Sequence, residues 1–260
     1  MSIPEVQFIS ESRVAFLTFN RPEARNAMTW PMYDALAEAC DLVDADHRIC
    51  AFVLRGAGDA FVAGTDISQF TSFASAADGI AYERRMERVI ERLEQVSVPT
   101  IAQVHGVAAG GGCLIALACD LRVCSSAARF GVPIARTLGN CLSGENCVRL
   151  VEAIGPARTR ELLFTGRLLD ATEAVSLGLA TRLTAVDALD AAVRELAQTI
   201  ADNAPLTIRA AKKAIHRIAH RRRLEDHFAD DLTTLCYGSQ DFREGVAAFL
   251  EKRKPRFTGR

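Results

Sequence analysis

Three consecutive glycines, Gly110–Gly112, interrupt an otherwise largely apolar stretch, VHGVAAGGGCLIALACD, at residues 104–120. The segment before them, TIAQVHG at 100–106, has the composition of a buried strand, and CLIALA at 113–118 has that of a buried helix. Glycines at a strand-to-helix junction restrict the fold, because residues without a side chain let other groups approach the backbone closely. The junction predicts either tight packing of a helix on a strand or a site built from main-chain groups.

The same order of strand, glycine-containing turn and helix recurs along the first half of the chain. Alternating β-branched and aromatic residues predict strands, and apolar residues at helical spacing predict amphipathic helices. After residue 145 helical segments dominate, and Gly155, Gly166 and Gly178 follow them at positions typical of helix ends. The sequence therefore predicts an α/β or α+β core with a helical C-terminal region. The predicted strands are 13–20, 49–55, 100–106 and 120–126, and the predicted helices are 30–46, 80–96, 113–118, 145–155, 157–166, 170–178, 187–202 and 205–222.

The composition is that of a globular protein with ample material for a core. The 260 residues are 49% hydrophobic and 24% charged, and the net charge of −1 gives no reason to expect nucleic acid or an acidic membrane as partner. The N-terminal segment lacks the pattern of a signal peptide, and no apolar window reaches about 18 residues, so a cytoplasmic protein is expected. The eight cysteines lie mostly in apolar runs without metal-ligand spacing, which favours buried thiols over disulfides or a metal site.

A second turn, AFVAGTDI at 60–67, resembles the turn VAAGGGCL at 107–114. Each follows a strand and leads toward a helix, where backbone N–H groups lack partners. Two such turns side by side could direct two N–H groups at one oxygen atom, which is the arrangement of an oxyanion hole. The alternative is that the glycines only allow close helix–strand packing. A phosphate site is less favoured, because the chain has neither GxGxxG nor a P-loop lysine here.

Six ordered segments resemble the crotonase, or enoyl-CoA hydratase/isomerase, family and cover nearly the whole chain. They are LTFNRPEARNAM at 17–28, AFVAGTDI at 60–67, VHGVAAGGGCLIALACDLRV at 104–123, FGVPIARTLG at 130–139, LLFTGRLLDATEAVSLGLATRL at 162–183 and EGVAAFLEKRKPRF at 244–257.

The resemblance implies a crotonase-like spiral of ββα units over residues 1–195, followed by a helical C-terminal trimerisation region over 196–260. It implies a homotrimer, or a hexamer built as a dimer of trimers. It also implies an acyl-CoA thioester as substrate, as in fatty acid metabolism, and no separate cofactor, because CoA is part of the substrate.

Family members bind the thioester oxygen between two backbone N–H groups, and by position the resemblance assigns these to Ala63 and Gly111. Each such donor can lower the barrier by about 3 kcal/mol. The resemblance also implies a set of substrate-binding residues. They are Arg25, Ala63, Gly64, Thr65, Asp66, Ile67, Gly111, Leu114, Ile134, Lys254 and Phe257.

The chain departs from the family pattern where the family's acids should be. The two glutamates of the hydratases correspond to Leu114 and Ile134, and an acid that some isomerases carry in the following loop corresponds to Ser143. Apolar side chains cannot accept a proton. Three explanations remain: another acyl-CoA reaction that uses other groups, decarboxylation of a malonyl-type thioester, which needs little acid–base help, or an acyl-CoA-binding protein without turnover.

The polar loop GNCLSGENC at 139–147 offers candidate replacements for the missing acids. Glu145 is the carboxylate nearest in sequence, and Ser143 offers a hydroxyl. The favoured alternative is structural, with Ser143 as the N-cap of a helix and Glu145 in its first turn.

Other polar residues are assigned more modest roles. Asp66 is expected to fix its loop or cap a helix rather than act as a base. Arg25, Lys254 and Phe257 match family positions near the CoA nucleotide, and in some members the tail acts from a neighbouring subunit. The basic segment 212–223 either attracts the CoA phosphates or balances acids on a neighbour, and its His216 and His220 are read as part of a solvated basic helix.

Overall fold

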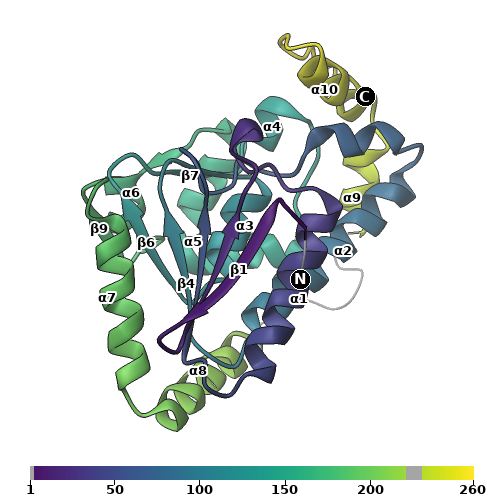
Figure 1. Ribbon diagram of the computed structural model, residues 1–260. Helices are drawn as coiled ribbons and strands as arrows, with labels where there is room; N and C mark the ends of the chain where they lie inside the picture. The colour runs from purple at the N-terminus through teal and green to yellow at the C-terminus, as the bar shows by residue number, and fades with distance from the viewer. Residues whose placement is uncertain (1–2, 221–229) are drawn as a thin grey trace.

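Two β-sheets organise the chain in the computed structural model, which describes residues 3–220 and 230–260 (Figure 1). The larger sheet has the strand order β1-β2-β3-β4-β6-β9, and the smaller has the order β5-β7-β8. Pairing is parallel except between β1 and β2 and between β7 and β8. The strands are β1 Val6–Glu11, β2 Val14–Phe19, β3 Ala51–Gly56, β4 Thr100–Val104, β5 Val107–Ala109, β6 Leu121–Ser125, β7 Arg129–Gly131, β8 Leu169–Asp170 and β9 Arg182–Thr184.

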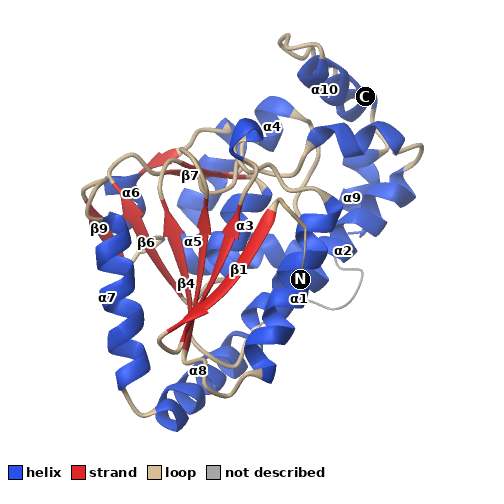
Figure 2. Cartoon of the chain, in the orientation of Figure 1, coloured by secondary structure: helices blue, strands red, loops and turns tan. Residues whose placement is uncertain are grey.

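Helices surround the sheets and make up most of the second half of the chain (Figure 2). This mixed α/β architecture confirms the predicted fold class. No helix within 3–220 and 230–260 is both long and apolar enough to cross a membrane. The helices are α1 Trp30–Ala45, α2 Ala76–Glu94, α3 Gly111–Ala118, α4 Ile134–Thr137, α5 Gly144–Thr165, α6 Ala171–Ser176, α7 Leu189–Asp202, α8 Pro205–His220, α9 Asp230–Tyr237 and α10 Gln240–Leu250, with short 3-10 turns η1 Pro22–Ala24 and η2 Ile67–Ser72.

Both faces of the larger sheet are buried at its inner strands β2, β3 and β4, which explains why these strands are mostly apolar, whereas the edge strands β1 and β9 are mostly exposed. Successive side chains of a strand point to opposite faces. In β2, Ala15, Leu17 and Phe19 belong to the main core, whereas Val14 and Phe16 belong to a second core with residues of α7. Helices α1, α2 and α3 supply the helical side of the main core, so the sheet lies between two layers of helix.

Most predicted elements are present within a few residues of their predicted ends, but some details differ. Strands β1, β5, β7, β8 and β9 and the short helix α4 were not predicted. The segments 145–155 and 157–166 form one assigned helix, α5, which is interrupted where Gly155 has a φ of 74° just before Pro156. Gly155, Gly166 and Gly178 all have positive φ, as expected at helix ends. The domain boundary predicted after residue 195 falls inside α7, and residues 221–222 of the predicted helix 205–222 lie outside the described residues.

The last two helices lie against an edge of the same chain. Helix α9 packs on α2, and α10 packs on η2. In Figure 1, α10 is drawn in yellow at the upper right, beyond the teal and blue body of the molecule. A third apolar cluster joins these elements, and its buried members are Ile67, Phe70, Leu138, Tyr237, Phe242 and Val246.

Candidate active site

The two glycine-containing turns lie side by side, as the sequence predicted. Val62 and Ala108 form a parallel bridge, and the Ala109 N–H donates to the Val62 carbonyl at 3.0 Å. The N–H groups of Phe61 and Val62 both donate to the Val107 carbonyl. This pairing fixes the segment 60–66 against the start of α3.

The Ala63 amide is not available as an oxyanion donor, which corrects the assignment made from the sequence. Its N–H donates to the Arg25 carbonyl at 3.0 Å. The physical reason is the pairing of this turn with residues 25–28, because the Gly64 carbonyl and the Asp66 N–H both bond to Met28, at 2.8 and 2.9 Å. In such a parallel bridge the amide of the residue between them faces the opposite way. The Thr65 N–H is therefore directed away from Met28.

Gly111 supplies the second amide. It is the first residue of α3, where an N–H group has no partner inside the helix. A Cβ atom built on Gly111 would lie 3.8 Å from the Thr65 nitrogen, so the two residues are neighbours in space. Neither N–H donates to another group in the part of the chain that the structure describes. Thr65 and Gly111 thus form a pair of adjacent main-chain donors.

The three glycines meet three different requirements. Gly110 has a φ of 51°, a conformation that glycine adopts at little cost. A Cβ on Gly112 would lie 2.1 Å from the Val62 carbonyl oxygen, so this glycine permits close packing of α3 on the neighbouring turn. A Cβ on Gly111 would lie 2.5 Å from the Tyr33 hydroxyl and 3.2 Å from Thr65 Oγ1. Gly111 therefore lets the Tyr33 and Thr65 hydroxyl groups lie close to the paired amides.

Three hydroxyl groups lie together beside the paired amides. Thr65 Oγ1 lies 2.8 Å from the Tyr33 hydroxyl and 3.0 Å from the Tyr82 hydroxyl. Burial is the main cause that raises the pKa of both tyrosines, and the charge of Glu83 adds to it. Both phenols therefore stay protonated and can donate hydrogen bonds at neutral pH.

The positions of the missing acids are apolar in space as well as in sequence. Leu114 lies on α3 and belongs to the main core, with 6% of its surface exposed. Ile134 begins α4 and packs against the same core. Neither position offers a group that could orient a water molecule.

The loop candidates Ser143 and Glu145 occupy the start of α5. The Ser143 hydroxyl accepts the Asn146 N–H as the N-cap and lies 3.4 Å from a Glu87 oxygen, while Glu145 lies in the first turn. This is the structural role that the sequence favoured for both residues.

Asp66 also has the role that the sequence favoured. It caps η2 by accepting the Ser68 N–H, and it forms an ion pair with Arg21 at 2.6 Å. Although burial opposes it, bonding to Ser68 and Arg21 holds the pKa of Asp66 below its usual value. Next to it, Gly64 has a φ of 128°, and Ile67 is buried in the third apolar cluster.

The expected CoA residues are spread over two exposed regions. Arg25 is exposed on the turn after β2. Lys254 lines a surface hollow of about 1060 Å³ beside α10, together with Arg243, Arg253 and Arg256. Phe257 lies close to Gly139 of the same chain, where an added Cβ would come within 3.3 Å of its ring. Lys212 pairs with Asp120 at 2.7 Å, whereas residues 221–223 of the basic segment lie outside the described residues.

The sequence analysis missed Glu83. Its carboxylate is buried on α2, where it accepts the Tyr237 hydroxyl at 2.6 Å and the Ser143 N–H at 3.2 Å. Burial raises its pKa to about 7. The sequence held a signal, because Glu83 lies three residues before Met86 and so continues the apolar stripe of this helix by one turn.

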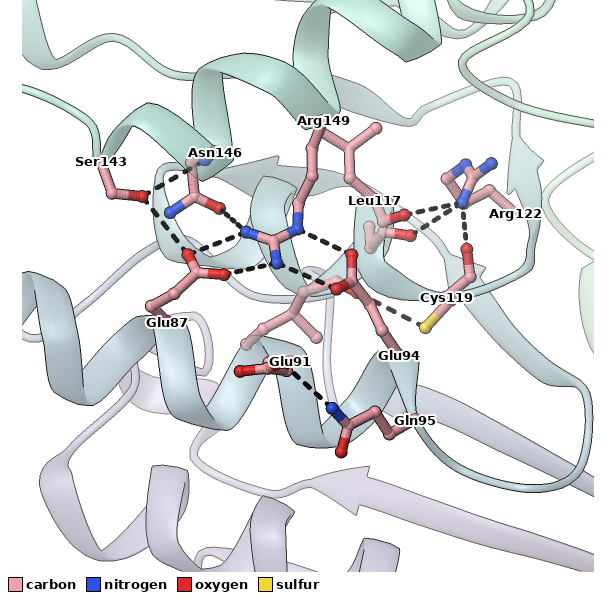
Figure 3. A network of polar contacts seen from close by, with 12 residues as sticks. Glu87, Glu91, Glu94, Gln95, Leu117, Cys119, Arg122, Ser143, Asn146 and Arg149 are labelled. Carbon is pink, nitrogen blue, oxygen red and sulfur yellow. Dashed lines mark hydrogen bonds and ion pairs between the residues drawn. The ribbon is translucent and has the colours of Figure 1, made fainter. Parts of the chain in front are cut away.

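A buried ion-pair network holds α5 on α2 beside Glu83 (Figure 3). The Arg149 guanidinium contacts Glu87 at 2.6 Å and Glu94 at 2.7 Å, and it donates to Asn146 at 2.9 Å. Figure 3 shows Arg149 reaching from α5 between the two glutamates of α2, with Ser143 at one side. The network fixes the loop that begins α5 over the helix that carries Glu83.

Comparisons with a family model and with individual proteins relate this chain to the same family. The sequence model of the enoyl-CoA hydratase/isomerase family matches residues 10–260. A probable enoyl-CoA hydratase of Mycobacterium bovis is 35% identical over 251 residues, covering 96% of each chain.

Solved structures agree in fold. An enoyl-CoA hydratase/carnithine racemase from Magnetospirillum magneticum is 35% identical, with a TM-score of 0.81, over 100% of this chain and 97% of the other. A methylmalonyl-CoA decarboxylase in complex with 2-nitronate-propionyl-CoA is 25% identical, with a TM-score of 0.91, over 100% of both chains.

Proposed function

The chain belongs to the enoyl-CoA hydratase/isomerase family, and we propose that it holds the thioester oxygen of an acyl-CoA between the N–H groups of Thr65 and Gly111. The observation that carries this proposal is the pair of adjacent amides that have no acceptor among the described residues. Two donors directed at an oxygen stabilise the negative charge that develops there when the thioester becomes an enolate, by about 3 kcal/mol each. No separate cofactor is needed for this step.

Decarboxylation of a malonyl-type thioester is the second candidate, and the apolar character of Leu114 and Ile134 favours it over hydration. In this reaction the bond between the α-carbon and the carboxylate breaks, CO2 leaves, and the electron pair becomes the enolate. The bond-breaking step needs an oxyanion hole but no base. The similarity to a methylmalonyl-CoA decarboxylase over the whole chain supports this candidate.

The CoA part of the substrate is assigned to residues outside the amide pair. Arg25 and Lys254 carry exposed positive charge, and Phe257 supplies an exposed ring. We expect them to contact the nucleotide. Helix α8 also exposes Leu206, Ile215 and Ile218 at 76%, 68% and 65%, which supports assembly into a trimer or a dimer of trimers.

A mass-spectrometric screen of the purified protein against enoyl-, malonyl- and β-ketoacyl-CoAs tests the proposal. We expect turnover of a malonyl-type thioester with release of CO2. Gly111→Pro removes an N–H donor and should abolish turnover. Full activity of Gly111→Pro would contradict the oxyanion assignment. Tight binding of thioesters without turnover of any of them would instead identify an acyl-CoA-binding protein.

A further inference from the structure

A carboxyl group that the family pattern does not account for lies beside the proposed site. Glu83 is 8% exposed, although a charged side chain is seldom buried without a charged partner. Its hydrogen-bond partners among residues 3–220 and 230–260 are a phenol and a backbone amide, Tyr237 and Ser143, and neither carries a compensating positive charge. The nearby guanidinium of Arg149 is bonded to Glu87 and Glu94 instead. A buried carboxyl held only by neutral donors is a common feature of groups that exchange protons.

Glu83 lies beside one of the positions where the family pattern expects an acid that this chain lacks. Its Oε2 atom accepts the N–H of Ser143, which is the position aligned with the loop acid of some isomerases in the family. The side chain therefore brings a carboxylate from α2 to the loop position where the sequence itself lacks one. A carboxylate on α2 can transfer a proton at the same place as one in the loop, because proton transfer requires only that the carboxylate lie within hydrogen-bond distance of the proton.

The surroundings of Glu83 connect it to the amide pair. Tyr237, whose hydroxyl donates to Glu83, packs against the Tyr82 ring with the two ring centroids 6.2 Å apart. The Tyr82 hydroxyl lies 3.0 Å from Thr65 Oγ1. Two side chains in contact therefore connect the Glu83 carboxyl to Thr65 of the amide pair.

We propose that Glu83 transfers the proton to and from the α-carbon of the bound thioester, in place of the acids replaced by Leu114 and Ile134. This inference rests on the proposed function. The Glu83 carboxylate takes the α-proton: the C–H bond breaks, an O–H bond forms on Glu83, and the electron pair moves into the enolate held by Thr65 and Gly111. The reverse step returns the proton to carbon. After decarboxylation only this return step is needed, and solvent then reprotonates Glu83.

Hydrogen–deuterium exchange at the α-carbon of butanoyl-CoA in D2O tests the inference. This saturated thioester can be neither hydrated nor decarboxylated, so exchange reports only enolate formation and proton transfer. We expect wild-type protein to exchange the α-protons, and Glu83→Gln to slow exchange by about 100-fold or more. Binding of butanoyl-CoA, measured by calorimetry, should change little. Glu83→Asp should restore part of the exchange, because it keeps the carboxylate.

Glu91→Gln is the matched control, since Glu91 lies two turns further along α2 and its side chain accepts a hydrogen bond from Gln95. It should exchange at the wild-type rate. The pH profile adds a second readout. Among the described residues, the titratable groups whose charge is coupled to that of Glu83 are Tyr82 and Glu87 on α2, Tyr33 on α1, Tyr237 on α9, Cys141 in the loop and Cys147 on α5. The rise in exchange with pH should disappear in Glu83→Gln.

Four results would overturn the inference. Equal exchange by wild type and Glu83→Gln excludes Glu83 alone and leaves the proposed function intact. Parallel loss of exchange and of binding in Glu83→Gln assigns Glu83 a structural role. Wild-type protein that binds butanoyl-CoA without exchange also excludes proton transfer by Glu83. Wild-type protein that binds no CoA thioester overturns the proposed function, and this inference with it.

Discussion

The chemistry open to this site depends on a few individual residues, some through their backbone N–H groups and others through their side chains. In the proposed function, Thr65 and Gly111 act through the main chain, whereas Leu114 and Ile134 lack the carboxyl groups of the acids that they replace. A protein can thus keep the means to stabilise a thioester enolate while losing the means to activate water.

Hydration of crotonyl-CoA should be feeble. General acid–base catalysis contributes about 10²–10⁴-fold per group, so replacement of both glutamates by Leu114 and Ile134 should cost several orders of magnitude. A spectrophotometric assay of purified protein measures this directly, with thioester binding measured in parallel. Robust hydration would show that another group has taken over. Loss of that activity in Glu145→Gln would then identify the loop carboxylate.

Glu83 should make the protein less stable as the pH rises. Its pKa is raised from 4.5 to about 7 in the folded chain, so the folded state keeps a proton that the unfolded state releases. The stabilisation is complete below about pH 4.5 and is lost as the pH rises through about 7, a change of about 3 kcal/mol.

Urea unfolding at pH 5 and pH 8 measures this effect of Glu83. Glu83→Gln should lack the corresponding loss of stability, while Glu91→Gln should retain it. The carboxyl groups with lowered pKa values, such as Asp44 and Asp66, titrate below this window. If wild type and Glu83→Gln lost the same free energy of unfolding between pH 5 and pH 8, the pKa of Glu83 would not be raised.

The sequence predicted part of the site, and the misses have a physical cause. Gly111 could be assigned from its place in the GGG motif that resembles the family, and the structure gives a reason for glycine there, because a side chain would clash with Tyr33. The choice of Ala63 was wrong because the direction of an amide depends on pairing with residues 25–28, which lie far away in the sequence. Glu83 was missed because one acid within a helical stripe is normally read as solvent-exposed.

At the scale of elements, polar contacts join α5 to α2 in addition to the apolar core that both helices share. Arg149 is 9% exposed and bridges Glu87 and Glu94 across the two helices. The periodicity of both helices could be read from the sequence. Their mutual orientation could not, because it depends on which charged side chains face each other.

Arg149→Met should destabilise the fold strongly. The change removes the guanidinium that Glu87 and Glu94 share in a largely buried position, and breaking such a buried pair typically costs about 3–5 kcal/mol. Chemical denaturation provides the measurement. Arg158→Ala is the matched control, because its ion pair with Glu161 is exposed and should contribute less than about 1 kcal/mol. Similar stability losses in the two variants would contradict this account.

At the scale of the whole molecule, the mixed α/β class and four strands of the larger sheet followed from the sequence pattern, whereas the smaller sheet β5-β7-β8 was not predicted. The packing of α9 and α10 was not predicted either, because both helices have apolar faces that could equally cover another copy. In the structure they cover α2 and η2 of their own chain. The apolar side chains of α8 remain exposed.

Self-association should depend on these exposed residues of α8. Wild-type protein should sediment and scatter light as a trimer or hexamer. Ile215→Glu places a charge where the side chain is 68% exposed in a single chain, so it should weaken the assembly without unfolding the subunit. Circular dichroism would confirm that the subunit stays folded. A monomeric wild-type protein in dilute light scattering would contradict the prediction.

The main-chain origin of the paired amides has a consequence for evolution. Every amino acid except proline carries an N–H group, so most mutations near Thr65 would leave the donor itself in place. Gly111 tolerates less, because a side chain there would collide with Tyr33. Acidic side chains, in contrast, can be lost or gained by single substitutions. Descendants of one ancestral gene can therefore inherit the power to stabilise an enolate and diverge in the reaction that follows it.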